Sequence, residues 1–369
     1  MRARLPILFI LITVAIDSIG IGLILPVMPD LIREVEGVDL AGAAVWGGIL
    51  SAVYAVMQFL FGPIIGGLSD RFGRRPVLLI TLGVMALDYI VMALAGSIWL
   101  LLAGRIVGGI TAATQSTAAA FIADLSEPEE KAARFGLIGA AFGLGFVIGP
   151  FLGGLLGEYG TRAPFYAAAA LAAANMVFGF FILPETVTDR IRRPFAWSRA
   201  NPLGAFSAVG ALPGVRRLLA MFFLYQVAFF AYPAIWAYFT RARFGWDPAM
   251  VGLSLAAFGV AMAAVQGGLI RVVLARLGEG GAVVYGLAFN FCAFLAMALV
   301  TSGRLAMLLI PLTALGAVVT PALQSMMSRT APDDAQGELQ GVLSSTVAVA
   351  MIVSPFVMTQ IFAAFTRPG

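Results

Sequence analysis

Hydrophobic runs of helical length recur from one end of the chain to the other, separated by short polar turns. A helix needs about 20 consecutive apolar residues to cross a bilayer. The pattern predicts eleven transmembrane helices, over residues 5–28, 43–64, 76–96, 98–122, 135–157, 163–183, 217–238, 249–270, 281–300, 305–325 and 340–364. The first run is interpreted as a membrane helix rather than a cleaved signal peptide, because it is too long, carries Asp17 at its centre and precedes no small-residue cleavage site.

The composition agrees with an all-α integral membrane fold. Hydrophobic residues occupy 61% of the 369 positions and charged residues only 11%. Soluble domains are roughly half apolar and about a quarter charged, so this composition excludes an ordinary soluble protein.

Several residue types are scarce enough to exclude classes of chemistry. The chain has no histidine and one cysteine, Cys292, which excludes His-based triads, the usual zinc sites and an internal disulfide. Its one lysine, Lys131, follows two glutamates, so a phosphate-binding loop ending in Gly-Lys-Ser/Thr is absent. No nucleophile or cofactor motif is present, and we expect a protein that is not an enzyme and holds no cofactor or resident metal ion.

The basic residues predict the orientation in the membrane. If the N-terminus is cytoplasmic, 16 of the 23 arginines and lysines lie in cytoplasmic loops and tails and six lie outside, with Arg105 inside a helix. Cytoplasmic loops carry an excess of positive charge, so this orientation in a bacterial-type inner membrane is favoured. The net charge of +4 reflects these anchors. No basic stripe with interleaved aromatic residues is present, and nucleic acid is not an expected partner.

The chain divides into two similar halves. A polar, arginine-rich stretch at 185–216 predicts a cytoplasmic linker between a six-helix bundle over 1–184 and a second bundle of five helices over 217–369. This is a 6+6 plan whose last helix is missing. Arg71-Phe72-Gly73 is echoed 205 residues later by Arg276-Leu277-Gly278, and Pro150 by Pro355. Parallel repeats of this kind are expected in a transporter whose site lies between the halves.

Three ionisable side chains fall at depth within the predicted helices. Asp17 lies about 12 residues, or roughly 18 Å, into the first helix, Asp88 is equally deep in the third, and Arg105 lies in the fourth. Such groups are costly in a bilayer and usually face a cavity or a partner. One interpretation is a water-accessible pathway in which a desolvated carboxylate loads and releases a proton. The alternative is a static Asp–Arg pair that holds helices together.

A short turn rich in glycine and charge joins the second and third helices. It reads Gly66-Gly67-Leu68-Ser69-Asp70-Arg71-Phe72-Gly73-Arg74-Arg75-Pro76. Glycine allows helices to approach closely, and an aspartate can cap or pair at a neighbouring helix end. A simple topology anchor would not need the alternation of Gly, Asp and Arg. This turn resembles the cytoplasmic signature of the major facilitator superfamily, in which the Asp and Arg belong to a charge cluster that latches the inner gate. The resemblance assigns that role to Gly67, Asp70, Arg71, Gly73 and Arg74, with Asp124 as a partner for Arg74.

The fifth helix carries a second motif. Gly145, Gly149-Pro150 and Gly153-Gly154 place a kink among small residues, which permits close, deformable packing. Beside the Asp-Arg turn, this resembles the antiporter motif of drug exporters, which implies export by exchange rather than uptake by symport.

Further stretches resemble the tetracycline/proton antiporters over nearly the whole chain. They are residues 23–29, 54–59, 69–79, 104–110, 321–324 and 336–341. In that family a complex of tetracycline with a divalent metal ion such as Mg²⁺ leaves the cytoplasm in exchange for protons. The resemblance implies that Asp17, Asp88 and Arg105 line the pathway and that Gln58 contacts the drug, although Gln58 is equally suited to an interhelical hydrogen bond. The expected partners are a small-molecule drug, protons and the lipid bilayer, with the protein acting as a monomer.

The sequence departs from that family at three points. A histidine common in the eighth helix is replaced near Met262, and an acid common in the ninth is replaced near Asn290. Neither residue exchanges a proton at physiological pH, so Asp17 and Asp88 would carry the coupling. The twelfth helix of the family is not present in this sequence.

Three other functions remain open from the sequence. An exporter of another amphipathic drug or metabolite, with altered or absent proton coupling, fits the altered second half. A channel or a non-transporting receptor would belong to a different class. Since a continuous pore has no need of an Asp-Arg latch, the inner turn favours alternating access.

Overall fold

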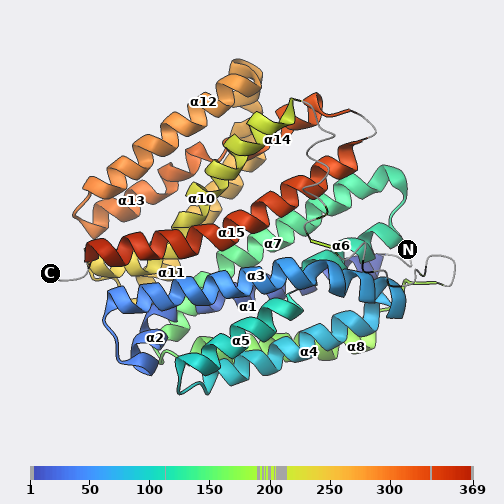
Figure 1. The fold of residues 1–369 in the computed structure, drawn as a ribbon, viewed down its shortest axis with the longest axis horizontal. Helices are drawn as coiled ribbons and strands as arrows, with labels where there is room; N and C mark the ends of the chain where they lie inside the picture. The colour runs from blue at the N-terminus through green and yellow to red at the C-terminus, as the bar shows by residue number, and fades with distance from the viewer. Residues whose placement is uncertain are drawn as a thin grey trace.

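The computed structural model describes residues 4–112, 114–188, 214–332 and 335–366, together with positions 192, 195, 197, 201, 202 and 204. Helices account for nearly all of the described chain, which contains no strand (Figure 1). The helices of the first half are α1 (Arg4–Ile24), α2 (Met28–Glu36), α3 (Leu40–Phe72), α4 (Arg74–Ala93), α5 (Ile98–Thr111), α6 (Thr114–Leu125), α7 (Pro128–Gly157) and α8 (Ala163–Ile182). Those of the second half are α10 (Val215–Phe244), α11 (Pro248–Ala264), the π-helix η2 (Val265–Leu269), α12 (Ile270–Leu299), α13 (Gly303–Thr313), the 3₁₀ turn η3 (Ala314–Gly316), α14 (Val319–Thr330) and α15 (Gln336–Thr366).

The membrane-spanning segments confirm the all-α prediction. Within the described residues, ten helical stretches are long and apolar enough to cross a membrane, and one of them extends over Pro248–Leu299, 52 residues. At 1.5 Å per residue this stretch would measure about 78 Å, more than twice the thickness of a bilayer core of about 30 Å. It is broken at Gly278, whose φ of 66° and ψ of −179° are not helical. Divided there, it supplies the two predicted helices at 249–270 and 281–300.

Two of the predicted helices are discontinuous, and a third is shorter than predicted. The segment expected at 98–122 is two helices, α5 and α6, that meet near Ala112. The segment expected at 305–325 likewise divides into α13 and α14 around η3. The breaks lie at Ala112 and Ala317. These residues are 205 positions apart, which is the interval of the sequence repeat. The segment expected at 5–28 ends at Ile24, and the short helix α2 follows it.

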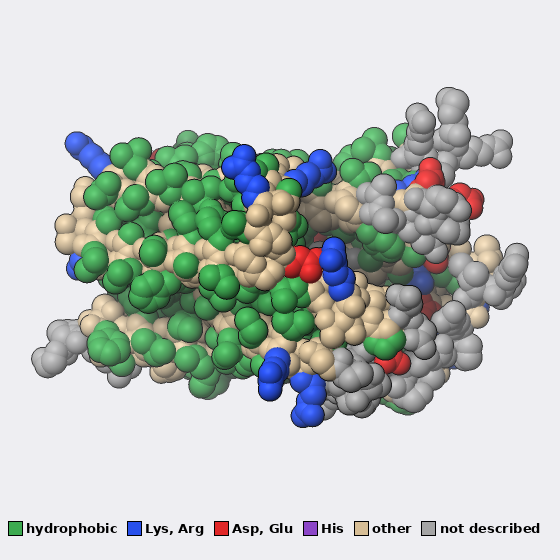
Figure 2. Space-filling view, turned by 90° about the horizontal axis from the view of Figure 1, so that it is seen from above, with side chains coloured by type: hydrophobic (Ala, Val, Ile, Leu, Met, Phe, Trp, Pro, Cys, Tyr) green, Lys and Arg blue, Asp and Glu red, His purple; other side chains and the backbone are tan. Residues whose placement is uncertain are grey.

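The buried side chains of the described residues form separate cores in the two halves. One cluster lies almost wholly within α1–α8, and two smaller clusters lie within α10–α15. In the first half, α8 packs against both α1 and α4. Hydrophobic side chains are spread over much of the described surface seen in Figure 2, as expected for a protein surrounded by lipid. Most of the predicted linker at 185–216 lies outside the described residues.

The two halves meet mainly along two helix pairs, α3 with α15 and α7 with α11. A Cβ on Gly48 of α3 would lie 2.9 Å from the carbonyl oxygen of Pro355 in α15. A Cβ on Gly252 of α11 would likewise meet the carbonyl oxygen of Pro150 in α7. Pro150 and Pro355 are the repeat-related prolines, so the two interfaces use the same device: a glycine lets the backbone of the opposite half approach.

These interfaces are closed at one end only. Gly66 lies about five helical turns beyond Gly48 on the same face of α3, yet a Cβ there would meet nothing within 4 Å. On α7, Gly154 contacts Pro248 of α11, whereas Gly136, on the same face about five turns earlier, faces open space. In Figure 1, α3 and α15 lie together at the left and diverge toward the right. The molecule is therefore open at the end that carries the α3–α4 turn, here called the Arg74 end, and closed at the opposite end.

Candidate transport site

Three charged side chains lie inside the first half, each on a different helix. Asp17 is on α1, Asp88 on α4 and Arg105 on α5. The Asp88 carboxylate lies against Gly104 and Gly108, on either side of Arg105 in α5. Arg105 lies over the ring of Tyr54, and Gly20, about one turn after Asp17 in α1, contacts Tyr89. The fold thus brings together the charged residues that the sequence places at depth in separate helices.

Two glycines make room for the Asp88 carboxylate. A Cβ on Gly104 would lie 2.8 Å from Oδ1 of Asp88, and a Cβ on Gly108 would lie 2.7 Å from Oδ2. Asp88 is only 6% exposed. A larger residue at either glycine would displace the carboxylate, so α5 is shaped to hold it.

The Arg105 guanidinium is held by soft contacts rather than by a carboxylate. Its Cζ lies 5.5 Å from the centroid of the Tyr54 ring, and Nη2 donates to Sδ of Met92 at 2.7 Å. Its Nε is enclosed and has no hydrogen-bond partner. Because no carboxylate is paired with it, the Arg105 guanidinium can still bind an anionic group.

The two carboxylates are also unpaired. Oδ1 of Asp17 is enclosed without a hydrogen-bond partner. In the described part of the chain, no ion pair within 4.0 Å includes Asp17 or Asp88. The static Asp–Arg pair that the sequence left open is not formed in this conformation, and two acids and one base stand close together without neutralising one another.

Tyr54 and Tyr89 complete this group and were not anticipated from the sequence. Tyr89 is 4% exposed, and a Cβ on Gly20 of α1 would lie 3.1 Å from its hydroxyl oxygen. Tyr89 directly follows Asp88, and Tyr54 opens the stretch 54–59 already noted for its resemblance. The sequence could have pointed to the two tyrosines through these positions, one beside Asp88 and one within the stretch 54–59.

Gln58 and Asn290 play the same part in the two halves. Nε2 of Gln58 donates to the carbonyl oxygen of Ala112 at 3.3 Å, where α5 breaks. Nδ2 of Asn290 donates to the carbonyl oxygen of Gly316 at 3.1 Å, where α13 breaks. A broken helix leaves carbonyl groups without partners, and these amides satisfy one at each break. For Gln58 the interhelical hydrogen bond is thus formed. Met262 lies among apolar side chains of the second half.

The α3–α4 turn is held by a cluster of charges within the first half. Arg74 pairs with Asp70 one helical turn earlier. Its Nε lies 3.2 Å from Oδ2 of Asp124 on α6, and its Nη1 donates to Oγ of Ser69 at 2.6 Å. The structure brings together Arg74 and Asp124 as the sequence predicted. Arg71 lies elsewhere, with its guanidinium 5.0 Å from the Phe72 ring centroid.

Glu185 is a member of this cluster that sequence reasoning missed. Its carboxylate accepts hydrogen bonds from the backbone N–H groups of Arg74 at 2.9 Å and Arg75 at 3.2 Å, the first free donors of α4. Gly73 has a φ of 112°, and a Cβ there would collide with the Glu185 carboxylate. Glycine is therefore needed at this turn for its backbone conformation and for space. A lone glutamate so distant in the sequence gives no local signal of this contact.

The glycines of the fifth predicted helix pack on two different partners. A Cβ on Gly149 would lie 2.7 Å from the carbonyl oxygen of Ile19 in α1, and Gly145 and Gly153 meet the backbone of the same helix. Gly154 and the carbonyl group of Pro150 face α11 of the other half, while the Pro150 ring lies against Gly22 of α1. The motif thus joins α7 to α1 on one side and to the second half on the other.

An ion pair joins the halves at the closed end. Arg241 of α10 pairs with Asp30 of α2, and its Nη2 donates to the carbonyl oxygen of Pro26 at 3.3 Å. Both side chains are partly buried. Neither residue was singled out from the sequence, because the pairing depends on two segments that lie in different halves of the chain.

A second charge cluster at that end lies within the first half. Glu34 accepts from Oγ1 of Thr161 at 2.5 Å and from Nη2 of Arg162 at 3.0 Å. The Thr161 hydrogen bond and the Arg162 charge lower the pKa of Glu34 below its ordinary value of 4.5. This contact ties α2 to the start of α8.

Comparison with known proteins identifies the family. The family described as Major Facilitator Superfamily matches residues 10–355. The chain belongs to this superfamily. It is a multi-pass membrane transport protein and not an enzyme. Its relatives include the class C tetracycline resistance protein of Escherichia coli, 42% identical over 99% of this chain and 91% of the relative. The class B protein of Escherichia coli is 35% identical over 95% of this chain and 87% of the relative. These relatives identify the chain as a drug efflux transporter of the superfamily.

Solved structures show the same fold. The human organic anion transporter MFSD10 (TETRAN) aligns with a TM-score of 0.72 at 28% identity, covering 98% of this chain and 94% of the other. A bacterial homologue of the human lysosomal transporter Spinster, described as inward-facing, aligns with a TM-score of 0.73 at 16% identity, covering 96% and 81% of the two chains.

Proposed function

We propose that this transporter exports tetracycline, as a complex with a divalent metal ion, in exchange for protons. The observation that carries the proposal is the group formed by Asp17, Asp88 and Arg105, in which two enclosed carboxylates lie beside a base without an ion pair to either. The names of the relatives support tetracycline as the substrate. The metal ion arrives as part of the substrate.

The group offers a physical basis for exchange. An enclosed carboxylate is costly while it is charged. A proton relieves that cost, and so does a cationic metal complex placed beside the carboxylate. The two neutralising species exclude one another at the same oxygen atoms, so arrival of the drug complex favours release of the proton. Asp17 and Asp88 bind either the proton or the metal complex, and Arg105 positions an anionic part of the drug.

Exchange also requires that the site between the halves be accessible from one side of the membrane at a time, and the conformation meets this requirement. The halves separate at the Arg74 end and touch at the Asp30–Arg241 end. With the N-terminus cytoplasmic in a bacterial inner membrane, the open side faces the cytoplasm, where an exporter collects its substrate. Each monomer contains both halves and works alone.

The test is uptake of tetracycline with Mg²⁺ into inverted membrane vesicles driven by an imposed pH gradient, acidic inside. Asp17→Asn removes a titratable carboxylate with little change in size, and we expect uptake to fall by at least about tenfold, equivalent to about 1.4 kcal/mol. Asp39→Asn is the matched control, because Asp39 caps α3 at 2.7 Å from the Gly42 amide and asparagine caps equally well. Unchanged uptake in Asp17→Asn would contradict the proposal.

A second candidate is export of another amphipathic compound with altered proton coupling. Asn290, which cannot titrate and whose amide is bonded to Gly316, favours it because the second half then contributes no proton-binding group near that position. The two candidates separate in one measurement, the uptake of tetracycline with Mg²⁺ into inverted vesicles. Uptake that ends when the pH gradient is collapsed supports the first candidate, and uptake no greater than that of vesicles without the protein supports the second.

A further inference from the structure

The break between α5 and α6 leaves a polar group inside the protein without a partner. Ala112, which follows α5, has a φ of −71° and a ψ of 39°, which are not helical. Thr114 is the first residue of α6 and is only 1% exposed. Its hydroxyl oxygen is enclosed and has no hydrogen-bond partner among the described residues. The amide of Gln58 does not serve it, since that amide donates to the carbonyl oxygen of Ala112.

The helix break explains why this hydroxyl is free. A threonine inside a helix usually donates to the carbonyl oxygen four residues earlier. Several buried threonines of this protein do so at 2.7–2.8 Å, among them Thr240, Thr346 and Thr359. For Thr114 that acceptor would be the carbonyl of Ile110, but the non-helical Ala112 lies between the two residues. The usual acceptor is therefore lost.

The second half shows that packing at this position does not need a hydroxyl. The repeat interval of 205 residues makes Val319, the first residue of α14, the counterpart of Thr114. Val319 is 0% exposed and belongs to the apolar core of its half. Valine and threonine are nearly equal in shape, and an enclosed hydroxyl without a partner costs free energy. A ligand that supplies an acceptor oxygen would recover that cost at Thr114.

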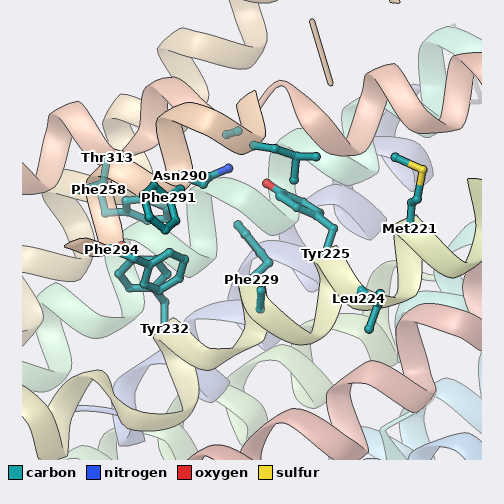
Figure 3. A pocket seen from close by; sticks show the side chains of 13 residues that line it. Met221, Leu224, Tyr225, Phe229, Tyr232, Phe258, Asn290, Phe291, Phe294 and Thr313 are labelled. Atoms are coloured by element: carbon teal, nitrogen blue, oxygen red, sulfur yellow. The ribbon is translucent and has the colours of Figure 1, made fainter. Parts of the chain in front are cut away.

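Two polar side chains at the corresponding break of the second half have partners. Figure 3 shows the pocket of about 360 Å³ beside that break, where Tyr225 and Asn290 are directed toward one another. Asn290 donates to the carbonyl oxygen of Gly316, and Thr313 donates to that of Ile310 at 2.7 Å. Thr114 differs from these residues in having no acceptor.

The break lies between the charged group and the open Arg74 end. Arg105 precedes Ala112 by seven residues, about 10 Å along the helix, and the far end of α6 carries Asp124, which belongs to the charge cluster at the Arg74 end. Gln58 lies one helical turn after Tyr54, on the same face of α3. A compound that enters from the Arg74 end therefore reaches the break before it reaches Arg105.

We propose that the start of α6 binds an electron-rich oxygen of the transported compound, a carbonyl or enolate oxygen, through the hydroxyl group of Thr114. Side chains lean toward the N-terminus of their helix, so this hydroxyl lies at the N-terminal end of α6. That end carries a partial positive charge and backbone N–H groups without helical acceptors, which favour such an oxygen. Because the hydroxyl is enclosed, binding requires α6 to tilt at Ala112, where the helix is already broken.

This inference rests on the proposed function, because it positions a second part of the drug beside the charged group. The test is Thr114→Val, which gives the first half the residue of the second. Calorimetric titration of the purified transporter with tetracycline and Mg²⁺ measures the Kd, and we expect it to rise by about tenfold through the loss of one hydrogen bond to an electron-rich oxygen. Thr114→Ser keeps the hydroxyl and should retain most of the affinity.

Thermal unfolding of the same preparations without drug supplies a second measurement. Thr114→Val should raise the unfolding temperature, because it removes an enclosed hydroxyl that has no partner. The matched control is Thr346→Val in α15, since Thr346 is 3% exposed and its hydroxyl donates to Val342 at 2.8 Å. This control should leave the Kd unchanged and should not raise the unfolding temperature, because it removes a hydrogen bond that is formed.

Three results would overturn the inference. An unchanged Kd in Thr114→Val, with tetracycline bound normally by the parent protein, would contradict the role of Thr114 and leave the proposed function standing. A lower unfolding temperature of Thr114→Val without drug would show that the hydroxyl serves the fold. Failure of the parent protein to bind tetracycline would overturn the proposed function and this inference together.

Discussion

The two halves of this transporter share a backbone plan and differ in chemistry. Both have a glycine of positive φ at the same turn, Gly73 and Gly278, and both have a broken helix whose free carbonyl is bonded by a side-chain amide. Among the described residues, the unpaired acids Asp17 and Asp88 and the enclosed Arg105 all lie in the first half. The second half places aromatic rings, hydroxyls and the neutral Asn290 around its interior. The repeat therefore preserves the positions at which helices bend and approach one another, while the charged side chains of the interior belong to the first half.

The largest effect is expected from exchanging that chemistry between the halves. Asp88→Asn replaces the carboxylate by a neutral amide, the group that Asn290 provides in the second half, and we expect uptake driven by a pH gradient in inverted vesicles to fall by at least about tenfold, or about 1.4 kcal/mol. Asn290→Asp places a titratable group in the second half, and uptake should then acquire a new dependence on pH. Equal retention of transport in both variants would refute the assignment of coupling to the first half.

A second comparison is between the closed and open ends of the interface. Gly252→Ala inserts a methyl group against the Pro150 carbonyl and should destabilise the protein by about 1–3 kcal/mol. Gly66→Ala meets open space and should leave stability unchanged or raise it by up to about 1 kcal/mol. Gly66 must nevertheless pack closely when the Arg74 end closes, so turnover should fall. Unfolding in detergent and transport assays, run on the same preparations, separate the two effects.

The ion pair between the halves offers a third test. Asp30→Asn removes the charge opposite Arg241 and should favour opening of that end by about 1 kcal/mol. Accessibility of Thr359→Cys to a membrane-impermeant reagent, in a Cys292→Ala background, measures the opening, because Thr359 is 1% exposed and faces Gly48 across the interface. The charge exchange Asp30→Arg with Arg241→Asp should restore the closed population. If the exchange behaves like the single variants, the pair does not hold the halves together.

The smallest effect concerns Glu34. Its pKa is lowered in the folded protein by the Thr161 hydrogen bond and the Arg162 charge. The stability that this contact provides is therefore present above the ordinary pKa of about 4.5 and is lost as the pH falls through the lower folded value. Because Glu34 is about half exposed, Glu34→Gln should cost only about 0.5 kcal/mol at pH 7, and the difference from the parent should vanish at low pH. Thermal unfolding at several pH values measures it.

Much of the fold followed from the sequence because membrane helices are specified by length and hydrophobicity, which are local properties. The pairing of Arg74 with Asp124 was also accessible, since each lies at the same end of a helix. The helix break at Ala112 was not, because neither glycine nor proline occurs within residues 111–114 to mark it. Glu185 and the Asp30–Arg241 pair were missed for another reason: their roles arise from packing between distant segments, which local spacing does not encode.

The contacts that close the interface have a consequence for how such a protein diversifies. At Gly252 the opposing atoms belong to the main chain of α7, at Pro150 and Gly154, and every amino acid has a carbonyl group. At Gly48 the carbonyl group of Pro355 is joined by the side chain of Thr359. Mutations of side chains that line the interior leave these main-chain contacts between the halves unchanged. Selection can therefore change which substrate is transported without changing the contacts that close the interface.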